Sequence, residues 1–394
     1  MPRVAVIVGT RPEGIKMASV YKSLAAADGF EPILVSTGQH REMLQQVFDI
    51  FELTADVDLK LMRRNQTLSG LTARLFDAFD NMLDELKPDM VLVQGDTTSV
   101  MCGAISAFYR EIPVGHVEAG LRTGNLRAPF PEEANRVIAS RVTDVHFAPT
   151  TGARDNLLSE GIAAPSIHVT GNTVIDSLLI EVEKQRNDQS IAEEVQTRLR
   201  VLLRESGASD NVRLDDQPFI LVTGHRRENF GKGFEDICDA LLAIAKRYPD
   251  HRLIYPVHLN PNVYDIVHNQ LSSCSNIMLL PPVDYRLFVS LMSQCKIALT
   301  DSGGVQEEAP SLGKPVLVMR ETTERPEGVD AGTVRLVGTD PGRIEEEVVR
   351  LLDDEQAYAE MAAHKNPYGD GHAAERIVEI LRSELADRDK APCA

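Results

Sequence analysis

The stretch Lys296-Ile-Ala-Leu-Thr-Asp-Ser-Gly-Gly-Val-Gln-Glu-Glu-Ala-Pro-Ser-Leu-Gly-Lys-Pro315 joins an expected strand to an expected helix through a turn with two glycines. Residues 297–300 form the short buried strand, and residues 305–312 begin the helix. Because glycine has no side chain, the backbone N–H groups of Gly303 and Gly304 can approach an anion at the positive end of the helix dipole. The segment therefore predicts an anion site where a strand passes into a helix.

Glu308 adds a second chemical feature to this segment. It lies one turn into the helix, roughly 6 Å along the axis, where its carboxylate can bind two ribose hydroxyls while the amides hold a diphosphate. No Gly-Lys-Ser/Thr follows the glycines, so the pattern indicates a nucleotide-diphosphate site other than a Walker A loop. An ordinary strand–helix connection capped by Ser302 explains the segment equally well.

Outside this segment, short apolar runs alternate with helical patterns. The expected strands are residues 4–8, 32–36, 90–94, 114–117, 145–148 and 167–170, and then 219–223, 253–257, 277–280, 297–300 and 316–319. The clearest intervening helices are residues 19–27, 71–86, 100–109 and 132–141. This alternation favours right-handed βαβ units and parallel sheets. With 394 residues in two such series, the sequence predicts an α/β fold of two Rossmann-like domains facing each other across a cleft.

The amino-acid composition of the chain argues against several classes of binding partner. Acidic residues number 59 against 41 basic ones, and the net charge of −18 argues against a nucleic-acid or anionic-membrane partner. No apolar run reaches membrane-spanning length, and the run at residues 4–8 is too short for a signal peptide. The five scattered cysteines contain no Cys-x-x-Cys, so we expect reduced thiols, no zinc site and a cytoplasmic location.

Several charged residues of the first half follow expected strands or open expected helices. Asp96 and Glu118 each end a strand, Glu132 opens a helix, and Arg136 follows Glu132 at i+4. Alternatives exist for each: Asp96 can cap the helix after Thr97, and Glu132 with Arg136 can be a helix-stabilising pair. If these acidic residues and arginines converge on one cleft, a functional site explains them better than separate structural roles do.

A glycine and an arginine follow the first strand of each series, as Gly9 with Arg11 and as Gly224 with Arg226. Ligands of open α/β sheets bind at the carboxyl ends of strands, so both turns are candidate ligand contacts. His225 lies inside the second turn, where an anion is expected. His116 precedes Glu118 by two residues within a strand, which predicts that both point to one face of the sheet.

Ten stretches together resemble the non-hydrolysing UDP-N-acetylglucosamine 2-epimerases, and they run in order along nearly the whole chain. They are Gly9-Thr-Arg-Pro-Glu-Gly-Ile-Lys16, Gly38-Gln-His-Arg-Glu-Met-Leu44, Gln94-Gly-Asp-Thr-Thr98, Gly115-His-Val-Glu-Ala-Gly-Leu-Arg-Thr-Gly124, Pro129-Phe-Pro-Glu-Glu-Ala-Asn-Arg136, Gly171-Asn-Thr-Val-Ile-Asp176, Thr223-Gly-His-Arg-Arg-Glu228, Tyr255-Pro-Val-His-Leu-Asn-Pro261, Asp301-Ser-Gly-Gly-Val-Gln-Glu-Glu308 and Thr323-Glu-Arg-Pro-Glu327.

The resemblance implies a glycosyltransferase-B-like fold, with an N-terminal domain at residues 1–170 and a UDP-binding domain at 171–372. The helix at about 373–394 is then expected to pack back on the first domain. The implied activity is reversible epimerisation of UDP-GlcNAc to UDP-ManNAc, which supplies ManNAc units for cell-surface polysaccharide. The family uses no cofactor, and no Gly-x-Gly-x-x-Gly follows a strand here. A homodimer is the state that the family implies.

The resemblance also implies residue roles. Family positions for the catalytic groups fall on Asp96, Glu118, Glu132 and His225. Those for substrate and UDP contacts fall on Arg11, Lys16, Arg136, Ser302, Gly303, Gly304, Glu308 and Arg325. Many bacterial relatives bind a second, activating UDP-GlcNAc, and the matching positions here are Gln39, Gln66, Arg226, Glu228 and His258. Some relatives have arginine where this chain has Asn65, which leaves the strength of regulation open.

Three other functions remain open on the sequence alone. A glycosyltransferase of the same fold also binds UDP at residues 302–308, but it needs an acceptor pocket rather than an excess of carboxylates. A hydrolysing relative releases ManNAc and UDP. A non-catalytic nucleotide-sugar sensor has no need of Asp96, Glu118 and Glu132 together.

Overall fold

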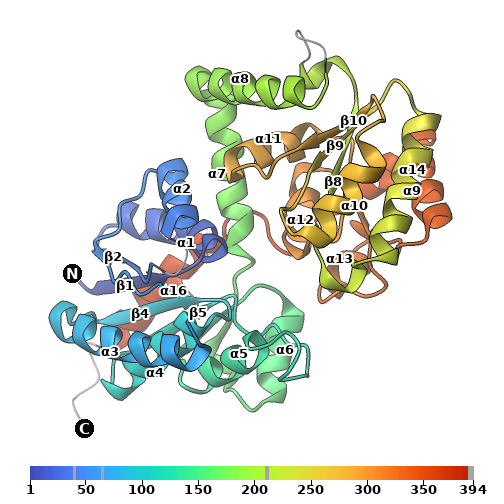
Figure 1. The fold of residues 1–394 in the computed structure, drawn as a ribbon. Coiled ribbons are helices and arrows are strands. Elements are labelled where there is room, and N and C mark those ends of the chain that lie inside the picture. Colours follow the sequence, from blue (N-terminus) through green and yellow to red (C-terminus); the bar gives the residue numbers. More distant parts are fainter. Residues whose placement is uncertain (39–40, 64–65, 209–212, 389–394) are drawn as a thin grey trace. The chain divides into compact units, whose positions relative to one another are not determined.

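The computed structural model describes residues 1–38, 41–63, 66–208 and 213–388 (Figure 1). The chain divides into two compact units. Unit 1 comprises Met1–Leu179 and the segment that begins at Tyr368, and unit 2 comprises Ile180–Pro367. The sequence placed the boundaries at residues 170 and 372. The first boundary of the structure lies inside helix α7 (Thr173–Asn187).

Unit 1 is built on a parallel sheet with the strand order β3-β2-β1-β4-β5-β6-β7. Its strands are β1 (Arg3–Val8), β2 (Glu31–Ser36), β3 (Val57–Asp58), β4 (Met90–Gln94), β5 (Val114–Val117), β6 (Val145–Ala148) and β7 (Ile167–Val169). Every residue of β4 and β5 is buried, as expected for strands of a parallel sheet that is covered on both faces. This order places the carboxyl ends of β1, β4 and β5 side by side.

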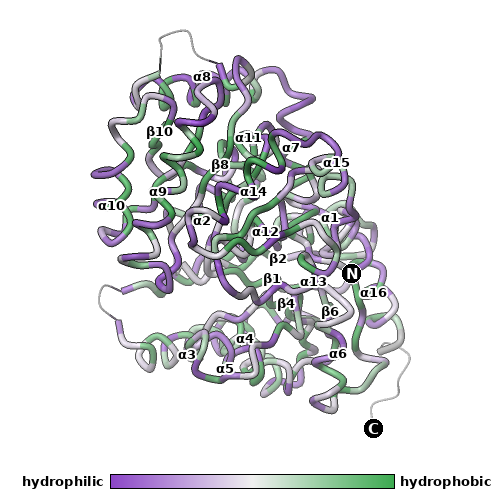
Figure 2. Tube along the Cα trace, turned by 90° about the vertical axis from the view of Figure 1, so that its right-hand side faces the viewer, coloured by the Kyte–Doolittle hydropathy of each residue, from purple (hydrophilic) through white to green (hydrophobic). Residues whose placement is uncertain are grey.

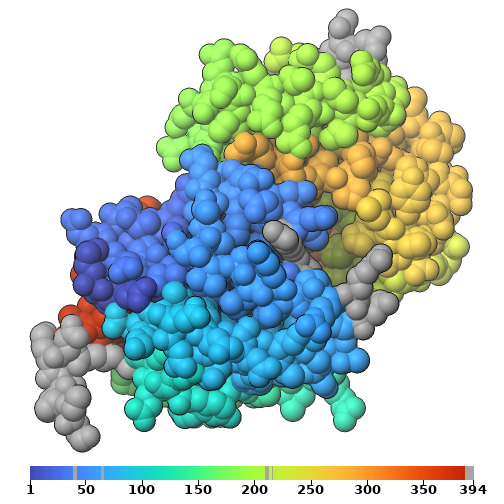
Figure 3. Space-filling model, turned by 60° about the vertical axis from the view of Figure 1, so that its left-hand side comes forward, coloured from blue at the N-terminus to red at the C-terminus, as the bar shows by residue number. Residues whose placement is uncertain are grey.

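Helices cover both faces of this sheet (Figure 1). Those of unit 1 besides α7 are α1 (Arg11–Ala26), α2 (Arg41–Phe51), α3 (Leu68–Leu86), α4 (Thr98–Tyr109), α5 (Glu132–Arg141), α6 (Thr151–Ser159), the short 3₁₀ turn η1 (Ala164–Ser166) and α16 (Ala373–Arg388). One core cluster joins Ile7, Leu75, Phe79 and Val93 between the sheet and the α3 and α4 helices. Helix α16 packs against α1, and in Figure 3 red atoms from near the C-terminus lie close to dark-blue atoms from near the N-terminus.

Unit 2 repeats the architecture with the strand order β10-β9-β8-β11-β12-β13, again parallel. Its strands are β8 (Phe219–Thr223), β9 (Arg252–Pro256), β10 (Ile277–Leu280), β11 (Ile297–Thr300), β12 (Val316–Val318) and β13 (Val334–Leu336). Strands β8 and β11 are neighbours, with Thr223 opposite Thr300. The turns after these two strands therefore leave the same edge of the sheet.

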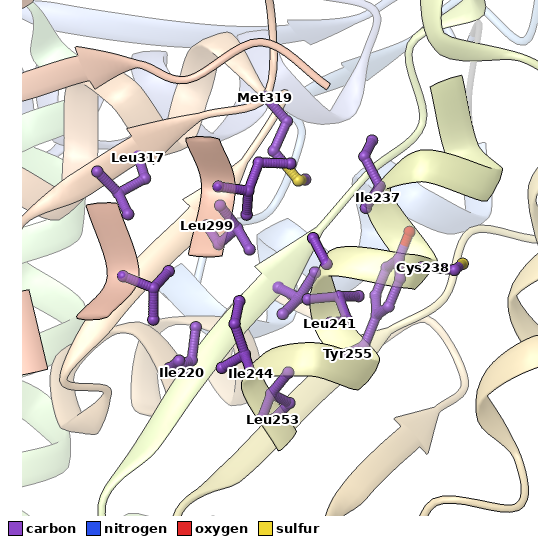
Figure 4. Packing of buried hydrophobic residues seen from close by; sticks show 14 of the residues in the cluster. Ile220, Ile237, Cys238, Leu241, Ile244, Leu253, Tyr255, Leu299, Leu317 and Met319 are labelled. Carbon is purple, nitrogen blue, oxygen red and sulfur yellow. The ribbon is translucent and has the colours of Figure 1, made fainter. Parts of the chain in front are cut away.

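The helices of unit 2 pack an apolar layer onto this sheet. They are α8 (Gln189–Glu205), α9 (Lys232–Arg247), α10 (Pro261–Leu271), α11 (Tyr285–Gln294), α12 (Gly303–Glu308), α13 (Pro326–Asp330), α14 (Pro341–Asp353) and α15 (Glu355–Ala363), with 3₁₀ turns η2 (Leu214–Asp216), η3 (Arg227–Asn229) and η4 (Ala309–Leu312). Figure 4 shows Ile237 and Leu241 of α9 against Ile220, Tyr255 and Leu299 of the strands. Hydrophobic residues follow β8 and β10 in Figure 2.

The expected α/β fold with two parallel sheets is confirmed, and two local predictions are wrong. Helix α1 begins at Arg11 rather than at residue 19, because Thr10 and Glu13 form a capping box directly after β1. Strands β3 and β13 were missed because they are two and three residues long and carry little apolar pattern. No helix among the residues that the structure describes is both long and apolar enough to cross a membrane.

Candidate active site

Glu118 lies at the carboxyl end of β5, where it meets donors from three other segments. Its carboxylate contacts the Lys16 ammonium and the Gln94 amide, and it accepts a hydrogen bond of 3.2 Å from Nδ2 of Asn172. The side chain is buried, and the backbone has a φ of 61°, in the left-handed region. A residue other than glycine rarely adopts this conformation, and such strain is typical of functional positions.

The prediction that His116 and Glu118 share one face of a strand is wrong, because β5 ends at Val117. His116 is instead fully buried, with Nε2 2.7 Å from the carbonyl oxygen of Gly95. Burial lowers the pKa of His116 to about 3, so the ring is neutral and Nε2–H donates to Gly95. The ring thus holds the turn that carries Asp96.

Asp96 follows Gly95 and is contacted from helix α5. Its carboxylate pairs with the Arg136 guanidinium, and its carbonyl oxygen accepts a hydrogen bond of 2.9 Å from Nδ2 of Asn135. The alternative of Asp96 as a helix cap is wrong, because Thr97 is the N-cap of α4 and accepts from the Val100 N–H. The Asp96 carboxylate is therefore not used for capping.

Glu132 is the first residue of α5 and is half-buried. Arg136 pairs with Asp96 and lies 3.4 Å from Glu133, so the alternative of a Glu132–Arg136 helix pair is wrong. Glu133, one residue later, is buried and accepts the N–H groups of Thr123 and Gly124 at 3.0 Å each. Within the described residues Glu132 takes part in no ion pair.

Glu13 is a residue of this region that the sequence prediction missed. Its carboxylate accepts the N–H groups of Gly9 at 2.5 Å and Thr10 at 2.8 Å, and the Thr97 hydroxyl at 2.5 Å. It therefore ties the turn after β1 to the turn after β4. Burial raises the pKa of Glu13 above its usual value, against the lowering effect of these hydrogen bonds. The capping-box spacing of Thr10 and Glu13 is a signal that the sequence does contain.

These contacts pair Lys16 of α1 with Glu118 after β5, and Arg136 of α5 with Asp96 after β4. Glu132 opens the helix that carries Arg136. Arg11 opens α1 one turn before Lys16. Gln66 lies elsewhere, before α3, where it contacts Arg74. Gln39 and Asn65 fall outside the described residues.

In unit 2, Asp301 joins the turn after β11 to the turn after β8. Its Oδ2 accepts the backbone N–H groups of His225 and Arg226 at 2.8 Å each, and its Oδ1 lies 3.1 Å from Nδ1 of His225. Burial alone raises the pKa of Asp301, but the His225 ring and the two amides outweigh it and lower the pKa. The carboxylate is therefore ionised and holds the glycine-containing turn of residues 224–226 beside Ser302.

The turn with two glycines passes into α12 at Gly303. Ser302 is its N-cap residue, as the alternative explanation of this segment expects, but its side chain makes no cap hydrogen bond. A Cβ atom on Gly303 would lie 2.5 Å from Cζ of Arg325, so only glycine lets that guanidinium lie against the turn. Nε of Arg325 in turn donates to Glu307 at 2.6 Å. Ser302, Gly303, Gly304 and Arg325 are thus brought together.

Glu308 is the last residue of α12, and its side chain is buried. One of its carboxylate oxygens accepts a hydrogen bond from Tyr285, a second residue that the sequence prediction missed. The Tyr285 hydroxyl of α11 donates to Oε1 of Glu308 at 2.9 Å. This hydrogen bond fixes the carboxylate at the end of the turn. Nothing in the local pattern around Tyr285 connects it to Glu308, because the contact is made by packing of α11 on α12.

Of the residues tied by resemblance to an activating ligand, Arg226, Glu228 and His258 lie near His225. Glu228 pairs with Arg320, which also donates to Glu324 at 2.7 Å. The rings of His225 and His258 are stacked with centroids 5.9 Å apart. No group of three or more His, Cys, Asp or Glu side chains in the described part of the chain is placed to hold a metal ion.

Comparisons with known proteins agree on one family. A profile described as UDP-N-acetylglucosamine 2-epimerase matches residues 22–382. Curated UDP-N-acetylglucosamine 2-epimerases from Escherichia coli K12 and Yersinia pestis are 51% and 50% identical, each over 97% of this chain and 98% of the relative.

Solved structures give the same result. The crystal structure of UDP-GlcNAc 2-epimerase from Neisseria meningitidis bound to UDP-GlcNAc has 46% sequence identity and a TM-score of 0.87, over 97% of this chain and 100% of that one. The enzyme from Methanocaldococcus jannaschii in complex with UDP-GlcNAc and UDP has 32% identity and a TM-score of 0.77, over 97% and 99%.

Proposed function

The chain belongs to the UDP-N-acetylglucosamine 2-epimerase family, and we propose that it interconverts UDP-GlcNAc and UDP-ManNAc by inverting carbon 2 of the sugar. The observation that supports this most strongly is a match to named epimerases over nearly the whole length of both chains. The enzyme is an isomerase, and its substrate is a nucleotide sugar.

The proton on carbon 2 of the sugar is only weakly acidic, so the reaction must first make it easier to remove. Carbon 2 has no adjacent carbonyl group, so direct removal of its proton is difficult. Departure of UDP from carbon 1 builds oxocarbenium character there and acidifies the neighbouring C–H. Loss of that proton gives 2-acetamidoglucal, and return of a proton to the opposite face with re-addition of UDP inverts carbon 2. Acid/base groups are then needed on both faces of the ring.

We assign the proton transfers to Asp96, Glu118 and Glu132. In support, Asp96 and Glu118 follow neighbouring strands of one sheet, and α5 carries Glu132 together with the Arg136 that pairs with Asp96. Lys16 and Arg136 supply positive charge beside two of these carboxylates. Arg11, at the start of α1, is a further substrate contact in this proposal.

We assign UDP binding to the turn after β11. In this proposal the amides of Gly303 and Gly304, with Ser302 and Arg325, hold the diphosphate, and Glu308 binds the ribose. The contacts of Arg325 with Glu307 and of Tyr285 with Glu308 support it. In this proposal His225 donates to the departing diphosphate, and its contacts with Asp301, directly before Ser302, support the assignment. Gln39, Gln66, Arg226, Glu228 and His258 remain the proposed contacts of an activating UDP-GlcNAc.

Proton NMR of the purified protein mixed with UDP-GlcNAc tests the activity. We expect an equilibrium mixture of UDP-GlcNAc and UDP-ManNAc, with both sugars still linked to UDP. A hydrolysing enzyme would instead accumulate free ManNAc and UDP. A glycosyltransferase without its acceptor, or a sensor, would leave the UDP-GlcNAc spectrum unchanged, and either result would overturn the proposal.

We further propose a homodimer in the cytoplasm. The cysteines within the described residues, Cys102, Cys238, Cys274 and Cys295, are free, which suits a reducing compartment. Light scattering coupled to size-exclusion chromatography tests the assembly: a mass of about twice the 43.4 kDa chain is expected, and a monomer at micromolar concentration would contradict it.

A further inference from the structure

We propose that Asp301 is a positioning residue for His225, holding the imidazole with Nδ1–H toward its carboxylate and Nε2 turned away from it. The inference deepens the proposed function, since it names the group that prepares His225 for the departing diphosphate. It rests on geometry within unit 2 alone: one carboxylate contacts both the backbone and the ring of the same histidine.

The contacts of Asp301 favour one tautomer of the His225 ring. Asp301 is completely buried, and its Oδ2 is already occupied by the N–H groups of His225 and Arg226. Its Oδ1 lies 3.1 Å from Nδ1 of His225 and makes no hydrogen bond of regular geometry to the described residues. Leaving a buried carboxylate oxygen without a donor is costly, so this contact favours a proton on Nδ1 of His225. The diverging Nε2 belongs to a side chain that is 41% exposed.

His258 has the opposite arrangement. Its Nδ1 accepts the backbone N–H of Asn260 at 3.1 Å, so that nitrogen carries no proton and Nε2–H is the tautomer of this ring. Burial, and then the charge of the stacked His225 ring, lowers the pKa of His258. Because Nδ1 of His225 faces Asp301, the nitrogen of that ring that is left for a ligand is Nε2.

The other ionisable groups around the pair do not take the place of Asp301 beside the His225 ring. Arg226, the next residue on the same turn, contributes its backbone N–H to Asp301. From β9, the Tyr255 hydroxyl is buried 3.4 Å from the Gly224 carbonyl oxygen, and burial raises its pKa well above the usual value, so it stays neutral. Asp301 is thus the carboxylate that faces the His225 ring, and its position directly before Ser302 places both at one edge of the sheet.

Nitrogen-15 NMR of histidine-labelled protein without substrate tests the arrangement directly. At a pH where the rings are neutral, we expect the Nδ1–H tautomer for His225 and the Nε2–H tautomer for His258. The resonances are assigned by their loss in His225→Gln and His258→Gln. Finding the Nε2–H tautomer at His225 in the unsubstituted protein would overturn the proposal without any variant of Asp301.

Asp301→Asn tests the consequence for binding and turnover. An asparagine amide that still accepts the two backbone N–H groups presents its NH₂ to Nδ1, which forces the Nε2–H tautomer and prevents protonation of Nδ1. We expect that tautomer change, UDP binding weakened about tenfold or more, and a similar loss of kcat. Unchanged tautomer and unchanged UDP affinity in a folded Asp301→Asn protein would contradict the assignment.

Asp340→Asn is the matched control, since Asp340 is also a carboxylate of unit 2 that accepts a backbone N–H, from Arg343 at 2.8 Å. It should leave both the His225 tautomer and UDP affinity unchanged. Because the tautomer is read without substrate, failure of the epimerase assay with the expected tautomer would overturn the proposed function and leave the positioning role intact.

Discussion

The Lys16 ammonium lies against the Glu118 carboxylate although the two residues are 102 positions apart in the chain. Their side chains are only 14% and 6% exposed, so neither charge is compensated by solvent. Removing either partner leaves a poorly hydrated charge and is therefore expected to cost far more than breaking a surface pair. The strained backbone of Glu118 is held in this position by the same contact.

The first prediction concerns the three carboxylates. Asp96→Asn, Glu118→Gln and Glu132→Gln each remove a group that can transfer a proton, so each should lower kcat by about a hundredfold or more with little change in UDP affinity. Steady-state rates and calorimetry measure the two effects. Asp155→Asn, which alters an exposed pair with Arg154, should retain full activity. Near wild-type turnover in any two of the three variants would contradict the assignment of proton transfer to these carboxylates.

The second prediction concerns the ribose contact. Glu308→Ala should weaken UDP binding by about 2 kcal/mol, because charge-assisted hydrogen bonds are lost. Tyr285→Phe leaves Glu308 in place without its donor and should cost about 1 kcal/mol. Tyr358→Phe removes a comparable hydroxyl contact to the Lys296 carbonyl oxygen and should have no effect. If the UDP affinity of Glu308→Ala is unchanged, Glu308 is not the ribose contact and the nucleotide binds elsewhere.

His116 gives a prediction on pH dependence. Its pKa is lowered by burial to about 3, so the NMR signals of its ring should not titrate between pH 5 and 8. The unfolded chain binds a proton at this residue below its ordinary value of 6.5 and the folded chain does not. The free energy of unfolding should therefore fall as the pH decreases from 6.5 toward 3. His116→Gln should reduce that slope in urea titrations, and a His116 midpoint inside the range of pH 5 to 8 would contradict the argument.

Substrate activation is the fourth prediction. If UDP-GlcNAc also binds at Gln66, Arg226, Glu228 and His258, initial rates should be sigmoidal in UDP-GlcNAc, because one ligand then changes the affinity or turnover for the other. UDP-ManNAc alone should react slowly until a trace of UDP-GlcNAc is added. Glu228→Gln, which weakens the pair with Arg320, should reduce the sigmoidicity. A hyperbolic curve with an unaided reverse reaction would indicate an unregulated enzyme.

The fifth prediction tests elimination. A carboxylate that exchanges its proton with water should leave deuterium on carbon 2 of the product made in deuterated water. Transient departure of UDP should also scramble an oxygen-18 label from the sugar–phosphate bridge into the non-bridging oxygens of the β-phosphate. A hydride mechanism through a keto sugar would retain both the hydrogen and the bridging label, and that result would rule out the proposed route.

The sequence predicted those parts of the fold that depend on local pattern. Strands such as β4 and β5 were placed with their observed bounds, because a parallel strand buried on both faces is a short continuous apolar run. The candidate residues at their carboxyl ends followed from a general property of α/β sheets. Helix α1 was begun too late because its first turn buries Glu13 and Gly14, which carry no apolar signal.

What the sequence did not reveal are contacts made by packing. The pairs Asp301–His225 and Tyr285–Glu308 join residues 76 and 23 positions apart, and no spacing rule connects them. The helix pair expected between Glu132 and Arg136 failed for the same reason. Arg136 instead binds Asp96, which is 40 residues away, because a tertiary partner displaced the local one.

Because the chain returns to unit 1 at Tyr368, unit 2 is synthesised completely before unit 1 is. Unit 2 is one continuous segment, whereas unit 1 lacks α16 until the segment that follows Tyr368 has left the ribosome. Ile377 and Leu381 of α16 are fully buried in the finished protein. A nascent chain halted before Ala373 therefore displays the uncovered apolar surface of α1 to chaperones and proteases, even when its second Rossmann-like unit is already complete.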